Sequence, residues 1–211
     1  MSREELLKAR PILFNTEMVR AILEGKKTET RRLLKPQPTY SSNDGFSWKG
    51  ATYGTDLPPT IKGASYNFRR AAPYQPGDIL YVRETWQYLY ELDGNEQIIE
   101  GTGRYYYAAT DQIPFDTYVD SRGISHEKTP WKPSIHMPKE AARIFLKVTD
   151  IRPERLQDID DNGVVAEGLQ IGDPFDELWN STIKKADRDR YGWDANPWVW
   201  VIKFKKLEGE D

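Results

Sequence analysis

The sequence predicts an α+β fold built around a small mixed β-barrel with flanking helices. Segments that alternate between apolar and polar residues dominate the chain, and short segments of helical periodicity lie between them. Hydrophobic residues make up only 38% of the 211 residues, so seven Trp, twelve Tyr and seven Phe must supply much of the core. This length predicts one domain, residues 1–211, and two long stretches without periodicity predict loop insertions within it.

Charge and composition exclude several classes of protein. The net charge of -3 excludes a polycation that coats nucleic acid, so an anionic partner must meet a local basic patch. The absence of cysteine excludes disulfides, thiol catalysis and Cys-ligated zinc, and two histidines are too few for a His-based metal site. No apolar run is long enough for a membrane span or a signal peptide. We therefore expect a cytoplasmic protein with no cofactor and no membrane partner.

The N-terminal part predicts a strand followed by a helix. Residues 12–14 form a short apolar run, and Thr16 is a suitable N-cap for a helix whose apolar positions share one face, namely Met18, Val19, Ile22 and Leu23. Gly25 is a natural C′ residue, because glycine takes a positive φ without steric strain. The basic stretch "EGKKTETRR", residues 24–32, therefore starts where this helix ends.

The middle of the chain contains both insertions. Residues 36–76 are rich in Pro, Gly, Ser, Asn and Tyr, and we expect little regular structure there. Residues 79–86 and 104–109 alternate as strands do, and residues 110–131 form the second insertion. Both insertions contain large aromatic side chains, so we expect them to border the cavity as a lid or an added wall.

The C-terminal part supplies three further strands and two helices. Residues 132–138 and 142–151 read as strands, and the second of them alternates most clearly. A helix is expected from Leu156 to Gly168, with Asp158 or Asp160 as its cap, and another over 173–183. The end of the chain, "NPWVWVIKFKKL", has the pattern of an amphipathic closing strand.

Several sequence blocks together resemble a known family. "ILEGKKTETRR", "QPGDILYVRETW", "VTDIRPERLQDIDDNGVVAEGL" and "WVWVIKFKKL" resemble the motifs of ASCH-domain proteins, which belong to the PUA-like β-barrel superfamily. The blocks "RPILF", "VRETW", "PSIHMP", "LWNS" and "WDANPWVW" are similar, in this order, to a subgroup common in phage and prophage genomes. The resemblance spans most of residues 10 to 207 and implies a PUA-like barrel. If the protein is encoded by a phage, the resemblance also implies that it works in the cytoplasm of the host.

The resemblance also implies an activity. Members of the superfamily are associated with RNA or modified-nucleotide binding, and one small bacterial branch is an amidohydrolase that acts on acetylated cytidine. Carried over by position, its catalytic Lys, Thr and Glu correspond to Lys27, Thr30 and Glu167. This chain is about twice as long as that branch and carries the insertions 36–76 and 110–131, so its substrate need not be the same.

These three side chains suit amide hydrolysis. Thr30 offers a hydroxyl nucleophile that needs a base beside it. A desolvated Lys27 is one candidate base, and a charged Lys27 would instead stabilise the oxyanion. Glu167 would carry the proton to the leaving amine. If the chain turns after Gly25, Lys27 and Thr30 point into the pocket, whereas Lys26 and Glu29 face solvent.

Other polar and aromatic residues are candidates for ligand binding. The basic stretch offers positive charge, although a lysine just after a helix also suits the helix dipole. "VRETW" offers a phosphate contact, an acceptor for an exocyclic amine and a stacking ring, and "KPSIHMP" offers two polar side chains on one side of a strand. The candidates are Lys26, Arg31, Arg32, Arg83, Glu84, Trp86, Ser134 and His136.

Three functions compete on the sequence alone. The first is a metal-independent hydrolase for a modified nucleoside, nucleotide or RNA base, which uses Lys27, Thr30 and Glu167. The second is a module that binds RNA or a modified base in the same cavity without reaction. A nuclease is disfavoured, because the sequence has no carboxylate cluster for a metal.

Overall fold

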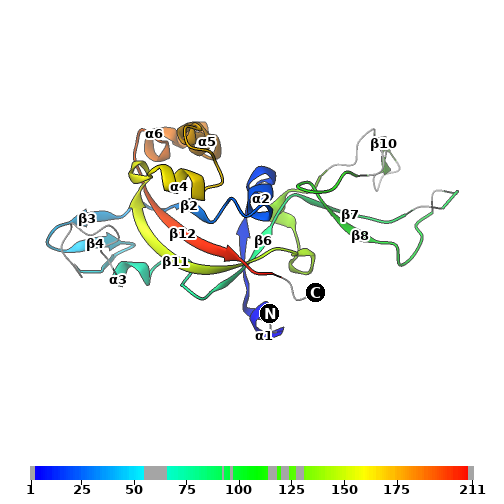
Figure 1. Ribbon diagram of the computed structural model, residues 1–211, viewed down its shortest axis with the longest axis horizontal. Helices are drawn as coiled ribbons and strands as arrows, with labels where there is room; N and C mark the ends of the chain where they lie inside the picture. The colour runs from blue at the N-terminus through cyan, green and yellow to red at the C-terminus, as the bar shows by residue number, and fades with distance from the viewer. Residues whose placement is uncertain are drawn as a thin grey trace.

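The computed structural model describes residues 3–54, 66–91, 93–95, 97–113, 118–119, 124–126 and 131–208. Its body is a five-stranded sheet with the order β1-β6-β11-β12-β2 (Figure 1). The strands are β1 (Arg10–Leu13), β2 (Glu29–Leu33), β6 (Ile79–Arg83), β11 (Phe145–Arg155) and β12 (Trp198–Lys206). β1 pairs in parallel with β6, and the other pairings are antiparallel. The predicted α+β class is confirmed.

Alternation along β12 places its two faces in two different cores. One face of this strand contributes Trp200, Ile202 and Phe204 to a core that helix α2 (Thr16–Leu23) covers with Val19 and Ile22. The other face contributes Val199 and Val201 to a second core, which helix α5 (Phe175–Thr182) covers with Phe175 and Trp179. The alternation in "WVWVIKFKKL" therefore marks a strand that is buried on both sides rather than on one.

In the described part of the chain, hydrogen-bonded strand pairs do not close the sheet into a barrel. β1 and β2 are its two edges, and neither has a second neighbour in the strand order. A side chain bridges them, because Nη2 of Arg32 on β2 donates a hydrogen bond to the carbonyl of Leu13 on β1. The sheet is thus strongly curved, with its two edges linked through one guanidinium group.

The first insertion contains regular structure, so the prediction of an irregular loop was wrong for its described residues. It forms a small antiparallel sheet, β3 (Thr39–Ser41), β4 (Gly45–Trp48) and β5 (Ala51–Thr52), and a short helix, α3 (Tyr66–Arg69). Phe68 is fully buried and stacks on Phe46 at 4.4 Å between ring centroids and on Trp200 at 4.9 Å. The insertion is thereby part of the first core. Residues 55–65 lie outside the described residues.

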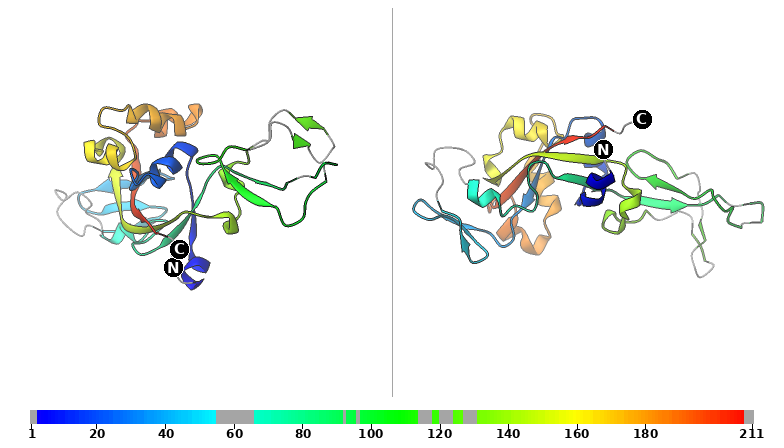
Figure 2. Two further views of the ribbon diagram at one scale, coloured as in Figure 1. Left: turned by 45° about the vertical axis from the view of Figure 1, so that its right-hand side comes forward. Right: turned by 90° about the horizontal axis from the view of Figure 1, so that it is seen from below.

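A two-stranded hairpin projects from the opposite end of the molecule (Figures 1 and 2). Its strands are β7 (Trp86–Leu89) and β8 (Arg104–Tyr107). The predicted strand 79–86 is therefore interrupted, because β6 ends at Arg83 and Trp86 already belongs to the hairpin. Of the second insertion, 110–131, the structure describes the pair β9 (Tyr118–Val119) and β10 (Ser125–His126) and a few flanking residues.

The helices largely follow the predicted ranges, with one exception. The expected helix 156–168 is a 3-10 turn, η3 (Leu156–Asp158), followed by α4 (Asp161–Ala166), and Asp160 caps α4 by accepting from the Gly163 amide. The expected strand 132–138 is wrong, because η1 (Ser134–His136) lies within this range, and η2 (Lys139–Ala141) follows it.

The remaining short helices are α1 (Arg3–Lys8), η4 (Lys185–Asp187) and α6 (Arg188–Tyr191). No helix in the described part of the chain is long and apolar enough to cross a membrane.

Candidate active site

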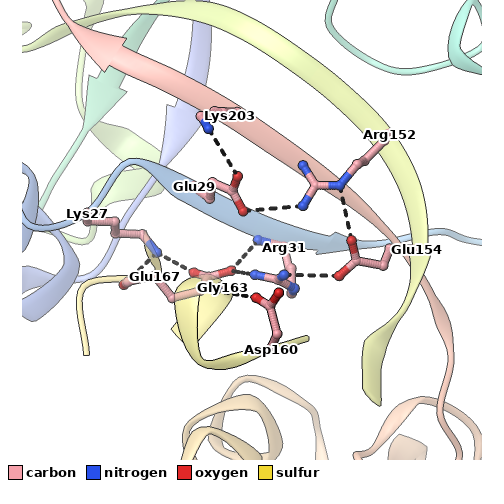
Figure 3. Close-up of polar contacts among 9 residues, drawn as sticks. All are labelled: Lys27, Glu29, Arg31, Arg152, Glu154, Asp160, Gly163, Glu167 and Lys203. Atoms are coloured by element: carbon pink, nitrogen blue, oxygen red, sulfur yellow. Dashed lines mark hydrogen bonds and ion pairs between the residues drawn. The ribbon is translucent and has the colours of Figure 1, made fainter. Parts of the chain in front are cut away.

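Glu167 lies at the open edge of β2, where the last turn of α4 meets the basic stretch (Figure 3). The Thr28 amide donates to the Ala166 carbonyl at 2.8 Å, and Lys27 forms an isolated bridge with Glu167. This short pairing fixes the helix end against the start of β2. It brings together residues that are 140 positions apart in the sequence.

Both carboxylate oxygens of Glu167 are engaged by cations. Oε2 pairs with Nζ of Lys27, which also donates to the Glu167 carbonyl at 2.9 Å. Oε1 accepts from the backbone amide of Arg31 at 2.8 Å and from Nη1 of Arg31 at 3.2 Å. The two side-chain cations and the carboxylate therefore form one hydrogen-bonded unit (Figure 3).

This unit is removed from solvent. The side chains of Lys27, Arg31 and Glu167 are 0%, 2% and 4% exposed. Burial lowers the pKa of Lys27 below its ordinary value of 10.5, and the nearby cations Arg32 and Arg31 lower it further, whereas Glu167 acts in the opposite direction. Lys27 thus holds its proton less tightly than a surface lysine does.

The unit continues into a chain of alternating charges on one face of the sheet. Nη2 of Arg31 donates to Glu154 at 3.0 Å, and Arg152 then connects Glu154, at 3.1 Å, with Glu29, at 3.5 Å. Strand register explains the order, because Arg31 lies opposite Val201 and Val201 lies opposite Arg152. The prediction that Glu29 faces solvent was wrong. Its side chain is buried, since it is the acidic partner of Arg152 and Lys203 (Figure 3).

A pocket of about 250 Å³ adjoins this unit. It wraps around the open edge of β2, with α2 contributing on one side and α5 on the other. The lining residues are Met18, Thr30, Arg31, Arg32, Leu33, Lys35, Glu167, Phe175, Leu178, Trp179, Thr182 and Ile183. The α5 side is mainly apolar, whereas the β2 side carries the charges.

The three residues expected to act together occupy different positions in this arrangement. Thr30 lines the pocket, and its hydroxyl makes no hydrogen bond with any described residue. Glu167 also lines the pocket, whereas Lys27 lies behind Glu167 and is not among the lining residues. Lys26 is exposed, as predicted, and pairs with Glu24 at 2.6 Å outside the pocket. Of the candidate binding residues, Arg31 and Arg32 line the pocket.

The backbone of β2 offers further polar groups to the pocket. In an antiparallel pair, alternate residues direct both their N–H and C=O groups away from the neighbouring strand. The Leu34 amide bonds to β12 at Trp198, whereas the Arg31 amide bonds outward to Glu167. Leu33 has the same parity as Arg31, so its N–H and C=O face the open edge without a partner among the described residues.

The candidates in "VRETW" belong to a different cluster. Nε of Arg83 donates to the Met137 carbonyl at 2.8 Å, and the buried Glu84 receives two bonds of 2.9 Å from Arg143. Trp86 packs against Met137 at the base of the hairpin. None of the three lines the pocket at β2, so the structure does not bring "VRETW" to this pocket.

Ser134 and His136 were expected to share one side of a strand. They lie instead in η1, where successive residues turn by about a third of a circle, so positions two apart diverge. His136 is exposed, Ser134 is partly exposed, and neither lines the pocket at β2. The described residues of both insertions do not line this pocket either, and the lid stays a prediction.

Sequence reasoning missed the partners on β11 and the wall formed by α5. The alternating charges Asp150, Arg152 and Glu154 were a usable signal, because residues two apart on a strand share a face. For α5 the three- and four-residue spacing of Phe175, Leu178 and Trp179 showed an amphipathic helix. Nothing in the sequence showed which strand edge this helix covers.

The described residues contain no group of three or more His, Cys, Asp or Glu side chains that could hold a metal ion. The pocket instead presents a hydroxyl, a carboxylate and several cations against an apolar wall, a set suited to binding and hydrolysing a small polar ligand. No protein-family model, no curated protein and no solved structure matches this chain.

Proposed function

We propose that the protein is a metal-independent amidohydrolase that acts on the N-acylated cytosine-type base of a modified nucleoside, nucleotide or RNA, on an ASCH-type, PUA-like fold in the cytoplasm. One observation carries the proposal. Thr30 and Glu167 line the same pocket, and Lys27 is bonded to Glu167, although the segments are far apart in the sequence. The curved sheet, whose edges Arg32 links, supports the PUA-like part of the proposal.

The geometry suggests a division of roles. Oγ of Thr30 forms a bond to the acyl carbon, and the C–N bond breaks. The hydroxyl proton passes through the Glu167 carboxylate to the leaving exocyclic nitrogen, which departs as a neutral amine. Water then cleaves the acyl ester of Thr30 and returns a proton to its hydroxyl. Lys27 and Arg31 are positioning residues, because they hold and charge-balance Glu167.

The volume and lining of the pocket suit a small ligand with one flat base. Its volume of about 250 Å³ lies below the roughly 300–1,000 Å³ typical of sites for drug-sized ligands. Phe175 and Trp179 of α5 offer an apolar surface for a base, and the open backbone groups of Leu33 offer a donor and an acceptor for its polar edge.

A chromatographic assay of acylated nucleosides tests the proposal. Wild-type protein should release the free amine, and Thr30→Ala and Glu167→Gln should lower kcat/KM by roughly a hundredfold or more, as expected for a nucleophile and a proton carrier. Lys27→Ala should lower it comparably, whereas Lys26→Ala should leave it nearly unchanged. Equal and mild effects of Lys27→Ala and Lys26→Ala on kcat/KM would show that the basic stretch 24–32 is only an electrostatic patch.

The complete burial of the Lys27 side chain favours a second function, a binding module for RNA or a modified base. A lysine sealed behind Glu167 stabilises the pocket wall without taking part in a reaction. Oligonucleotide affinity measured from 50 to 200 mM salt distinguishes the two functions. A steep loss of affinity together with no turnover supports the binding module, because phosphate contacts release counterions.

A further inference from the structure

The pocket at β2 has more positive than negative side chains. Arg31, Arg32 and Lys35 line it, and Glu167 is the only acidic residue among the lining residues. Glu167 is already engaged by Arg31 and by Lys27 behind it. Glu167 acts on the charge of Arg32 only at longer range, and neither Arg32 nor Lys35 makes an ion pair with a described residue.

Arg32 is partly buried and incompletely satisfied. One nitrogen donates to the Leu13 carbonyl, and the guanidinium lies over the Phe14 ring at 5.0 Å. Its Nε is buried and has no hydrogen-bond partner, and Arg32 makes no ion pair with any described residue. A guanidinium stays charged under all ordinary conditions, so such a site favours an anion that supplies the missing bonds.

Lys35 supplies a second free cation two positions beyond the end of β2. It is exposed, its Nζ lies 4.7 Å from the centre of the Tyr191 ring, and it makes no ion pair with any described residue. It therefore offers a solvent-exposed cation at the pocket wall. Between the two cations, the outward N–H of Leu33 is a third donor without a partner in the described chain.

We propose that this pocket binds a nucleotide rather than a nucleoside, with the phosphate monoester of the ligand held by Arg32, Lys35 and the Leu33 amide. The base part of this inference rests on the proposed function. Guanidinium groups bind phosphate through paired N–H donors, and a lysine adds a mobile point charge. In this arrangement the base lies against the apolar α5 side, and the phosphate lies toward the exposed Lys35.

Isothermal titration with cytidine, cytidine 5′-monophosphate and a cytidine trinucleotide tests this proposal. Wild-type protein should bind the monophosphate at least about tenfold more tightly than cytidine, as charge-assisted hydrogen bonds predict. Lys35→Gln should remove most of this preference, and the exposed Lys205→Gln should retain it. Because Arg32 also links two strands, it is tested as Arg32→Lys, which keeps the charge but loses the paired donors and should weaken the preference.

The outcomes separate this inference from the proposed function. Equal affinity of wild-type protein for cytidine and its monophosphate overturns the phosphate site, even when acylated cytidine is hydrolysed. A preference that depends on Lys35, found without any hydrolysis, supports the phosphate site and overturns the hydrolase. Tighter binding of the trinucleotide than of the monophosphate, with a steep salt dependence, overturns the mononucleotide in favour of an RNA chain.

Discussion

At the scale of single residues, Glu167 connects the charged groups of the site. It accepts hydrogen bonds from two side-chain cations and one backbone amide while nearly excluded from water. Buried ion pairs add little net stability when complete, but loss of one partner leaves an uncompensated charge. The arrangement therefore makes each of its members sensitive to substitution.

Lys27→Met should lower the free energy of unfolding by about 3 kcal/mol, because it leaves Glu167 with an incomplete set of partners in a buried position. Urea denaturation followed by circular dichroism measures this loss. Lys26→Met is the matched control, since Lys26 is exposed and should change stability by less than about 0.5 kcal/mol. A loss of the same size in both variants would contradict the assignment of Lys27 to a buried pair.

The lowered pKa of Lys27 predicts a pH dependence of stability. Between the folded-state pKa and the ordinary value of 10.5, the unfolded chain binds more protons than the folded chain. The free energy of unfolding therefore gains a contribution that increases as pH rises through this window. Burial raises the pKa of Tyr74 above its ordinary value of 10.0. Above pH 10 the unfolded chain therefore loses the Tyr74 proton more readily than the folded chain, which lowers the free energy of unfolding. Stability is therefore measured below this pH.

Urea denaturation at several pH values up to about 9.5 tests this dependence. The contribution should be present in wild-type protein and absent from Lys27→Met. The same slope in both proteins would show that another group titrates.

The residue types of the site were more predictable than their orientation. Family resemblance pointed to Lys27, Thr30 and Glu167, and the structure brings all three to one strand edge. Periodicity failed for Glu29, because the residue that makes it a buried partner, Arg152, lies on another strand. Lys35 and the α5 wall were not predicted, since no local pattern states which distant segments form a pocket.

At the scale of elements, two glycines end the helices that flank the site. Gly25 and Gly168 have φ values of +72° and +91°, and both were predicted from the sequence as helix ends. A Cβ on Gly25 meets no atom within 4 Å, whereas a Cβ on Gly168 lies 2.8 Å from Cβ of Ala21 and 3.1 Å from Cβ of Lys27. The two positions share backbone strain and differ in packing.

Gly168→Ala should therefore destabilise the protein more than Gly25→Ala does. Both carry the left-handed backbone penalty of roughly 1–2 kcal/mol, and only Gly168→Ala adds overpacking of about 1–3 kcal/mol. Thermal or urea denaturation of the two variants measures the difference. Equal losses of unfolding free energy in the two variants would mean that α4 shifts away from α2 at no energetic cost.

Long alternating elements were the predictable part of the fold. The expected strands over 142–151 and the C-terminal segment correspond to β11 and β12, whose patterns extend over many residues. Strands β3, β4 and β5 have two to four residues each, too few for a periodic signal. They form because Phe46 and Trp48 find partners in the distant Phe68 and Trp200.

At the scale of the whole molecule, the first insertion and the sheet share a core. Phe68→Ala should lower the free energy of unfolding by about 3–5 kcal/mol, the range for truncating a buried phenylalanine. Tyr40→Ala in the same insertion should cost about 1 kcal/mol, because Tyr40 is 40% exposed. Urea denaturation compares the two. Similar small losses would indicate that the insertion folds independently of the sheet.

The strand order has a consequence for synthesis on the ribosome. β11 and β12 occupy the centre of the sheet, yet they leave the ribosome after β1, β2 and β6 have already emerged. The nascent chain therefore carries β2 without its strand partner until β12, the last strand, is translated. Stalled chains that end before residue 198 should be cleaved rapidly by added protease and should engage chaperones, whereas chains that expose residue 206 beyond the exit tunnel should resist cleavage.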